Sequence, residues 1–170
     1  MNYFISTGEL SGDLHASYIV EKIKNLDKNA KVYAIGGMNL KKQDVEIVRD
    51  IDSLAIMGFV EVVKNFNFLK KVLEETVEFI LSNNIDRVVL VDYGGFNLKL
   101  LERLKLKKPS LKITYYIPPK VWIWGKKRVP KIAKADEILV IFPWEVDFYK
   151  KENVKALYFG NPFMEKYEKI

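Results

Sequence analysis

The sequence predicts an α/β protein with a doubly wound, mainly parallel sheet. Short apolar runs alternate along the chain with longer amphipathic segments, a pattern typical of consecutive β-α-β units. Several of the apolar runs are followed by turns that carry glycine, aspartate or proline. In such a sheet these turns gather at the carboxyl ends of the strands, where ligands bind.

The expected strands are short apolar runs bounded by turn residues, at 2–6, 31–35, 45–48, 87–91, 112–117, 137–142 and 156–159. The run at 87–91 is strongly β-branched, and the run at 45–48 is the weaker candidate. The expected helices cover 13–25, 66–81, 98–106 and 144–151. In the second of these, Leu69, Val72, Leu73 and Ile80 recur at helical spacing.

The composition indicates one folded domain. The chain has 170 residues, of which 49% are hydrophobic and 29% charged, enough for a real core. Cysteine is absent, which excludes disulfides and thiolate metal sites, and the single histidine argues against a histidine-built metal centre. We therefore expect no metal and no cofactor. The first residues lack the features of a signal peptide, and no apolar run approaches the roughly 20 residues of a membrane span, so membrane contact would be peripheral.

Positive charge is concentrated in one part of the chain. Residues 99–134 hold twelve Lys or Arg and one acid, a net charge of +11, whereas the other residues hold sixteen basic and twenty-one acidic side chains, a net charge of −5. The sum is the overall +6. A concentrated basic segment indicates an anionic partner, which could be phosphate, nucleic acid or acidic lipid.

The turn at 8–13 follows the first strand and opens a helix. Gly8 and Gly12 would let the backbone approach a ligand, and a helix N-terminus favours an anion. Two acids, Glu9 and Asp13, make the turn poorly suited to pyrophosphate, and it is not a dinucleotide fingerprint. The alternative is that Ser11 or Asp13 caps the helix and the glycines merely turn the chain.

The segment 92–97 follows the strand at 87–91. An aspartate at the tip of a buried central strand points toward the binding crevice, where Asp92 could accept a proton from an attacking hydroxyl. Alternatively, Asp92 caps the next helix and the glycine pair is turn chemistry. Asn97 could orient a sugar hydroxyl or cap the helix.

The segment 115–128 combines two adjacent prolines, two tryptophans and a basic cluster. Trp122 and Trp124 beside Lys126, Lys127 and Arg128 suit a surface that is part apolar and part anionic, such as a lipid headgroup or a phosphosugar. The alternative is a tryptophan pair in the core with solvated lysines alongside. A second apolar run, at 56–63, is typical of a buried helix or loop, or, if exposed, of a lipid-facing patch.

Six segments resemble, in order, the motifs of lipid A disaccharide synthases. Residues 8–13 resemble the family's G-E-A-S-G-D, 57–62 its M-G-[FI]-x-E-V, and 92–97 its D-x-P-x-F-N. Residues 115–128 resemble Y-Y-[IV]-x-P-x-V-W-A-W-x-x-x-R nearly residue for residue, 142–149 resemble L-P-F-E-x-x-F-Y, and 160–162 the G-H-P turn.

The resemblance implies an inverting glycosyltransferase of the GT-B fold, which joins UDP-2,3-diacylglucosamine to 2,3-diacylglucosamine 1-phosphate on the inner face of the inner membrane of Gram-negative bacteria. It implies Asp92 as the catalytic base. The expected acceptor-binding residues are Gly8, Glu9, Ser11, Gly12, Asp13, Asn97, Trp122, Trp124 and Arg128. Lys126, Lys127 and Arg128 would meet phosphate or anionic lipid.

The chain departs from the family pattern in three ways. Gly94 stands where the motif has proline, which could loosen the turn after Asp92, and Asn161 stands where the motif has histidine. Family members also continue for about as long again, through a domain that binds the UDP-sugar. The resemblance thus implies an acceptor domain over 1–163 and the start of a hinge at 164–170, without the donor domain and inactive alone.

The rival interpretation is a nucleotide- or nucleic-acid-binding module that uses the +11 segment. That segment lacks the regular aromatic platform of single-strand binders, so we expect no nucleic-acid partner. Under either interpretation, the turns at 8–13, 92–97 and 118–124 should lie on one rim of the sheet.

Overall fold

The computed structural model describes residues 1–54, 62–123 and 125–162. Their strands form one seven-stranded sheet in the order β3-β2-β1-β4-β5-β6-β7, in which every neighbouring pair is parallel. The strands are β1 (Asn2–Ser6), β2 (Lys31–Gly36), β3 (Glu46–Asp50), β4 (Arg87–Val91), β5 (Lys112–Tyr116), β6 (Glu137–Val140) and β7 (Leu157–Tyr158). All seven predicted strands and the predicted fold class are confirmed, with ends shifted by one or two residues.

The helices are α1 (Leu10–Leu26), α2 (Met38–Lys41), α4 (Val62–Ser82), α5 (Gly94–Lys107), α6 (Val129–Ile132) and α7 (Pro143–Lys151), with a 3-10 turn η1 (Lys126–Arg128). Residues 51–54 are also helical. The four predicted helices are confirmed, but α1, α4 and α5 begin three, four and four residues earlier than expected. Of the glycines that were expected to turn the chain, Gly8 precedes α1, whereas Gly12, Gly94 and Gly95 lie in the first turn of a helix, where Gly12 and Gly94 permit close packing.

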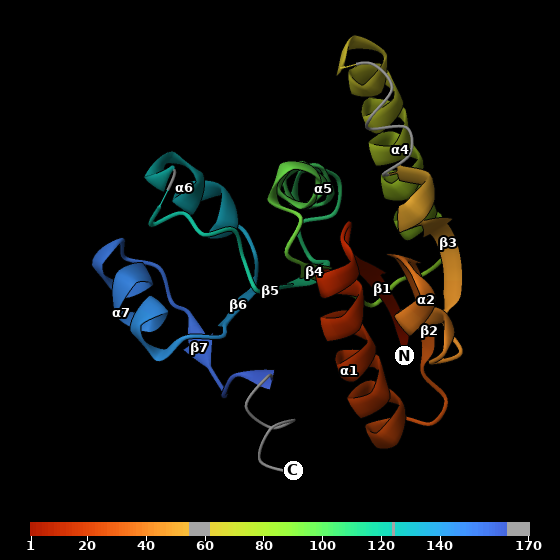
Figure 1. Ribbon diagram of the computed structural model, residues 1–170, viewed down its shortest axis with the longest axis horizontal. Helices are drawn as coiled ribbons and strands as arrows, with labels where there is room; N and C mark the ends of the chain where they lie inside the picture. The colour runs from red at the N-terminus through yellow and green to blue at the C-terminus, as the bar shows by residue number, and fades with distance from the viewer. Residues whose placement is uncertain (55–61, 124, 163–170) are drawn as a thin grey trace.

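Each strand sends alternate side chains into two separate cores. Phe4, Val88 and Leu90 belong to the core under α4, α5, α6 and α7, whereas Ile5 and Val89 belong to the core under α1 and α2. Figure 1 shows α4, α5 and α6 on one side of the strands and α1 on the other. Burial on both faces explains why the central strands read as continuous apolar runs.

The crossovers diverge between β1 and β4, which are neighbours in the sheet. From β1 the chain passes through α1 to β2 on one side, and from β4 it passes through α5 to β5 on the other. This divergence is a topological switch point, and crevices for ligands form outside the carboxyl ends of the strands at such a point.

Candidate functional site

The turns at 8–13 and 92–97 and the described part of the third turn, 118–123, lie together at this switch point. A Cβ added to Gly8 would collide with the ring of Tyr93, and a Cβ added to Gly94 would collide with the ring of Pro119. The middle turn therefore contacts the other two, which confirms the prediction of a shared rim. The family motif has proline at the position of Gly94, and in this chain the ring of Pro119 fills the space beside that position.

Asp92 stands at the tip of β4 in a strained backbone conformation. Its φ is 47° and that of Tyr93 is 48°, values in the left-handed region that few non-glycine residues adopt, although aspartate does so more often than most. The backbone amide of Asp92 donates to the carbonyl of Tyr116 at 3.1 Å, and its carbonyl accepts from the Tyr115 hydroxyl at 3.0 Å. The conformation is thus held from β5, the neighbouring strand.

Asp92 does not cap α5, contrary to one of the two interpretations of this turn. The N-cap position belongs to Tyr93, without a side-chain hydrogen bond, and Gly94 and Gly95 are helical rather than turn residues. The left-handed conformation that glycine would normally supply is taken by Asp92 and Tyr93 themselves. The carboxylate of Asp92 thus lies at the rim without capping α5.

Burial raises the pKa of Asp92. The amide of Tyr93, Lys120 and His15 each lower this pKa, but by less than burial raises it. His15, on α1, is itself buried, with its ring edge-to-face with Tyr116 at a centroid distance of 6.2 Å. Burial lowers the pKa of His15, and the nearby Asp92 partly offsets this effect. A carboxylate with a raised pKa is a better proton acceptor than an ordinary surface aspartate.

Asn97 ties the ends of β1 and β4 together. Its Oδ1 accepts from the Ser6 hydroxyl at 2.6 Å, and its Nδ2 lies within hydrogen-bond distance of the carbonyls of Ser6 at 3.1 Å, Val91 at 3.2 Å and Asp92 at 2.9 Å. The side chain is fully buried and lies at the fourth helical position of α5, so it does not cap the helix. These bonds tie Asn97 to the backbone of Asp92.

The segment 8–13 divides into exposed and buried parts. Glu9 is the N-cap of α1 without a side-chain hydrogen bond, so the idea that Ser11 or Asp13 caps the helix is wrong. Glu9 and Ser11 are exposed at the helix N-terminus. Asp13 is fully buried, with Oδ1 accepting from the amide of Gly37 at 2.6 Å and Oδ2 from that of Asn39 at 2.8 Å. Asp13 therefore holds the turn after β2 in place.

Trp122 packs into an aromatic cluster at the edge of the core. Its ring lies edge-to-face with Trp144 at 4.7 Å and with Phe148 at 6.1 Å between centroids, and it is partly buried. Trp122 thus fits the core interpretation better than that of an exposed anchor, while Trp124 lies outside the described residues. The exposed aromatics here are Phe142 and Trp144, which stack at 6.0 Å.

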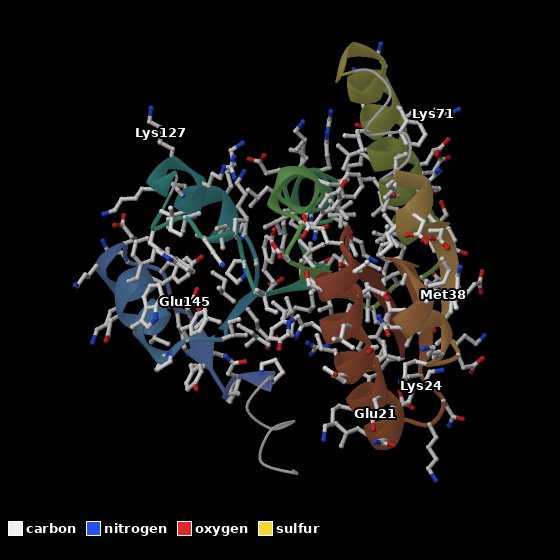
Figure 2. The ribbon with its side chains drawn as sticks, viewed as in Figure 1. Glu21, Lys24, Met38, Lys71, Lys127 and Glu145 are labelled. Carbon is white, nitrogen blue, oxygen red and sulfur yellow. The ribbon has the colours of Figure 1, made fainter. Side chains whose placement is uncertain are left out.

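The three cations at 126–128 differ in their surroundings. Lys126 pairs with Glu152 at 3.0 Å and lies 5.8 Å from the centroid of the Phe148 ring. Lys127 and Arg128 are exposed, and Figure 2 shows Lys127 projecting outward from η1. Acidic side chains from outside the segment 99–134, such as that of Glu152, partly neutralise the +11 charge of that segment.

Sequence reasoning missed four residues around Asp92: Ser6, His15, Tyr93 and Tyr115. The period-2 alternation of β5 could have revealed Tyr115 as inward-facing on the same side as Leu90, but its bond to the Asp92 carbonyl requires the fold. The apolar run at 56–63 lies mainly outside the described residues. Within the described residues, no group of three or more acidic or histidine side chains could hold a metal ion, and no helix is long and apolar enough to cross a membrane.

The matching family model and the similar sequences point to the same protein family. A family model described as lipid-A-disaccharide synthetase matches residues 3–169. A lipid-A-disaccharide synthase of Geobacter metallireducens is 37% identical over 163 residues, and one of Persephonella marina is 36% identical over 166. Each alignment covers 95% of this chain and 42% of the relative, so the chain spans less than half the length of these relatives.

Two solved structures share the fold at low sequence identity. A UDP-GlcNAc 2-epimerase from Neisseria meningitidis, bound to UDP-GlcNAc, has a TM-score of 0.68 at 9% identity and covers 95% of this chain and 46% of its own. MurG of Acinetobacter baumannii has a TM-score of 0.58 at 12% identity, covering 95% and 45%. These likenesses establish the Rossmann-like fold. The family match over nearly the whole chain adds the lineage: this chain belongs to the lipid-A-disaccharide synthetase family.

Proposed function

We propose that this chain is the acceptor-binding part of a glycosyltransferase that transfers 2,3-diacylglucosamine from UDP to 2,3-diacylglucosamine 1-phosphate. The observation that carries the proposal is the position of Asp92: it stands at the switch point, at the tip of a central strand, in a backbone conformation imposed by its neighbours. The proposed reaction is that of the family to which the chain belongs. This membership also argues against a nucleic-acid-binding module.

Asp92 acts as the general base in this proposal. Its carboxylate takes the proton of the acceptor's primary hydroxyl as the hydroxyl oxygen attacks the anomeric carbon and UDP leaves, which inverts that carbon. The partial burial of Asp92 raises its pKa, which favours proton transfer in the transition state. Because Asn97 and Tyr115 bind its backbone carbonyl rather than its carboxylate, they orient the base without consuming its acceptor oxygens.

The other rim residues have graded roles. The exposed Glu9 and Ser11 and the backbone at Gly8 contact the acceptor sugar directly, whereas the buried Gly12, Asp13 and Asn97 act by holding the rim. Arg128 binds the acceptor's phosphate, and the partly buried Trp122, together with Trp124, borders only one of its acyl groups. No metal or other cofactor takes part in the proposed reaction.

The chain extends over 1–163 as the acceptor domain in this proposal, with a hinge from 164 onward. The UDP-diacylglucosamine donor is held by the further domain of longer family members, so residues 1–170 alone do not catalyse transfer. The enzyme works in the cytoplasm on the inner face of the inner membrane. Lys126, Lys127 and Arg128, with the exposed Ile123, Phe142 and Trp144, face the anionic lipid.

The test is the substitution Asp92→Asn in a full-length enzyme that carries this sequence. Loss of a general base lowers kcat roughly 10²- to 10⁴-fold, and acceptor binding should change little because asparagine keeps the shape. The measurement is disaccharide formation from purified donor and acceptor, with the 170-residue chain as a control that forms no product. A near-normal rate for Asp92→Asn would refute the assignment of the base.

A further inference from the structure

A cavity of about 510 Å³ lies between α4 and α5, beside the Asp92 turn. Its lining runs from the start of α5 to beyond the middle of that helix, faces the middle of α4, and consists of Leu69, Lys70, Leu73, Tyr93, Gly95, Phe96, Lys99, Glu102 and Arg103. Since helices in this sheet run antiparallel to the strands, their N-terminal halves lie toward the carboxyl ends of the strands. The cavity therefore opens on the same side of the sheet as the candidate site.

The floor of the cavity is apolar and preformed. Leu73 and Phe96 are each 6% exposed and belong to the core. The ring of Tyr93 stacks on that of Phe96 at a centroid distance of 5.8 Å, and the same ring packs against Gly8. One side chain thus forms a wall of the cavity and also contacts the switch point, one residue from Asp92.

The mouth of the cavity is basic. Its charged lining residues are three cations and one acid, which gives a net formal charge of +2. The acid, Glu102, is bound by Lys131 at 3.1 Å and Lys134 at 3.2 Å. Lys70 and Lys99 are exposed beside the opening. An occupant with an apolar tail and an anionic head fits this distribution, whereas a nucleotide would find few polar partners for its base and ribose.

We infer that this cavity binds one acyl chain of the acylated sugar phosphate, and that Lys70 and Lys99 at its mouth attract the anionic head together with Arg128. The volume lies in the range of pockets that enclose a small ligand. Because Tyr93 is adjacent to Asp92 in sequence, a chain held here would leave the sugar at the rim, where its hydroxyl meets the base. This inference rests on the proposed function and deepens it by assigning a place to one acyl group.

Gly95 offers a way to fill the cavity without disturbing the fold. It lies in the first turn of α5, lines the cavity, and an added Cβ would meet no atom within 4 Å. Gly95→Leu should occupy the mouth, and Gly95→Ala is its matched control. A second pair is Leu69→Asp, which places a charge in the lining, and Leu106→Asp, at a position of α5 that is 75% exposed and outside the cavity.

The experiment is calorimetric titration of the 170-residue chain with octyl, decyl, dodecyl and tetradecyl phosphate, each below its micelle concentration. Burial of each added methylene should tighten binding about fourfold until the cavity is full, after which affinity levels off. Inorganic phosphate alone should not bind measurably. Gly95→Leu and Leu69→Asp should weaken dodecyl phosphate binding at least about tenfold, with Gly95→Ala and Leu106→Asp close to the unsubstituted chain.

The outcomes separate a single bound chain from a bilayer. Vesicles of phosphatidylglycerol and phosphatidylcholine should bind Gly95→Leu as well as the unsubstituted chain. Affinity independent of alkyl length, or dodecyl phosphate binding that both cavity variants retain, would overturn the inference. So would vesicle binding that Gly95→Leu abolishes while alkyl phosphate binding stays unchanged. If any of these results were obtained and the Asp92→Asn enzyme were inactive, the proposal of Asp92 as the base would stand, and only the proposed acyl site would be refuted.

Discussion

The two halves of the candidate rim are built on different principles. At the switch point between β1 and β4, the polar side chains of Ser6, Asp13 and Asn97 are fully buried, and each is hydrogen-bonded within the protein. After β5, the segment 118–128 is held by aromatic packing, and its cations face solvent. The first half fixes the backbone around the Asp92 carboxylate, and the second half presents a surface.

This difference assigns different consequences to substitutions in the two halves. A buried polar network is costly to interrupt because the remaining partners cannot reach water. An exposed cation contributes little to stability but acts on a charged partner through space. Substitutions at the switch point should therefore alter folding as well as chemistry, and substitutions at 126–128 should alter association alone.

The largest effect on stability is expected for Asn97→Ala. The change leaves the Ser6 hydroxyl and the buried carbonyls of Ser6, Val91 and Asp92 without their amide partner. The free energy of unfolding should fall by roughly 2–4 kcal/mol, measured by urea denaturation. The matched control is Asn83→Ala, an exposed asparagine with one hydrogen bond to the carbonyl of Phe79, which should cost at most about 0.5 kcal/mol. Equal losses for the two would contradict the network.

An intermediate effect is expected for combined neutralisation of Lys126, Lys127 and Arg128. Each cation near an anionic surface contributes about 1 kcal/mol, but Lys126 is already paired with Glu152. Binding to anionic vesicles should weaken roughly 10- to 30-fold, measured by co-sedimentation, and urea stability should stay within about 0.5 kcal/mol.

The control for this prediction neutralises three other exposed lysines, Lys22, Lys28 and Lys31, which lie on α1, in the loop after it and at the start of β2. It changes the net charge by the same amount. If the control weakened vesicle binding equally, net charge rather than the 126–128 surface would govern the association.

The same contrast explains how much could be predicted from the sequence. The strands and their parallel orientation follow from apolar runs and their spacing, because both faces of this sheet are covered. The position of Asp92 at a rim follows as well, since it directly succeeds the run 87–91. These signals are local, so they can be interpreted without knowledge of tertiary contacts.

The roles of Asp13 and Asn97 could not be predicted in this way. Asp13 bonds to residues 24 and 26 positions away, and Asn97 bonds to a residue 91 positions away. No local pattern encodes such partners, so both side chains read as caps or ligand contacts. The early start of α5 was missed for a related reason: Asp92 and Tyr93 adopt the left-handed conformation that a Gly-Gly pair would ordinarily supply.

The smallest expected effect is that of Asp92→Asn on the free energy of unfolding. The matching substitution of Asp13, on the same rim, should change that free energy in the opposite direction. Burial raises the pKa of Asp92 in the folded protein. A raised pKa means that Asp92 favours folding below the unfolded-state value of 3.8 and that this contribution is lost as the pH rises through the folded-state pKa. At pH 7 the ionised Asp92 therefore opposes folding, and the neutral asparagine removes that opposition.

Asp92→Asn should accordingly raise the free energy of unfolding at pH 7 by up to about 1 kcal/mol, after allowance for its partial exposure to solvent, and the gain should vanish below pH 3.8. Asp13→Asn should instead lower stability by roughly 1–3 kcal/mol, because one of its two acceptor oxygens becomes a donor that faces a backbone amide. Urea titrations from pH 3 to pH 8 measure both. A loss of stability for Asp92→Asn at pH 7 would show that the Asp92 carboxylate holds the fold together, as Asp13 does, and is not strained in readiness for chemistry.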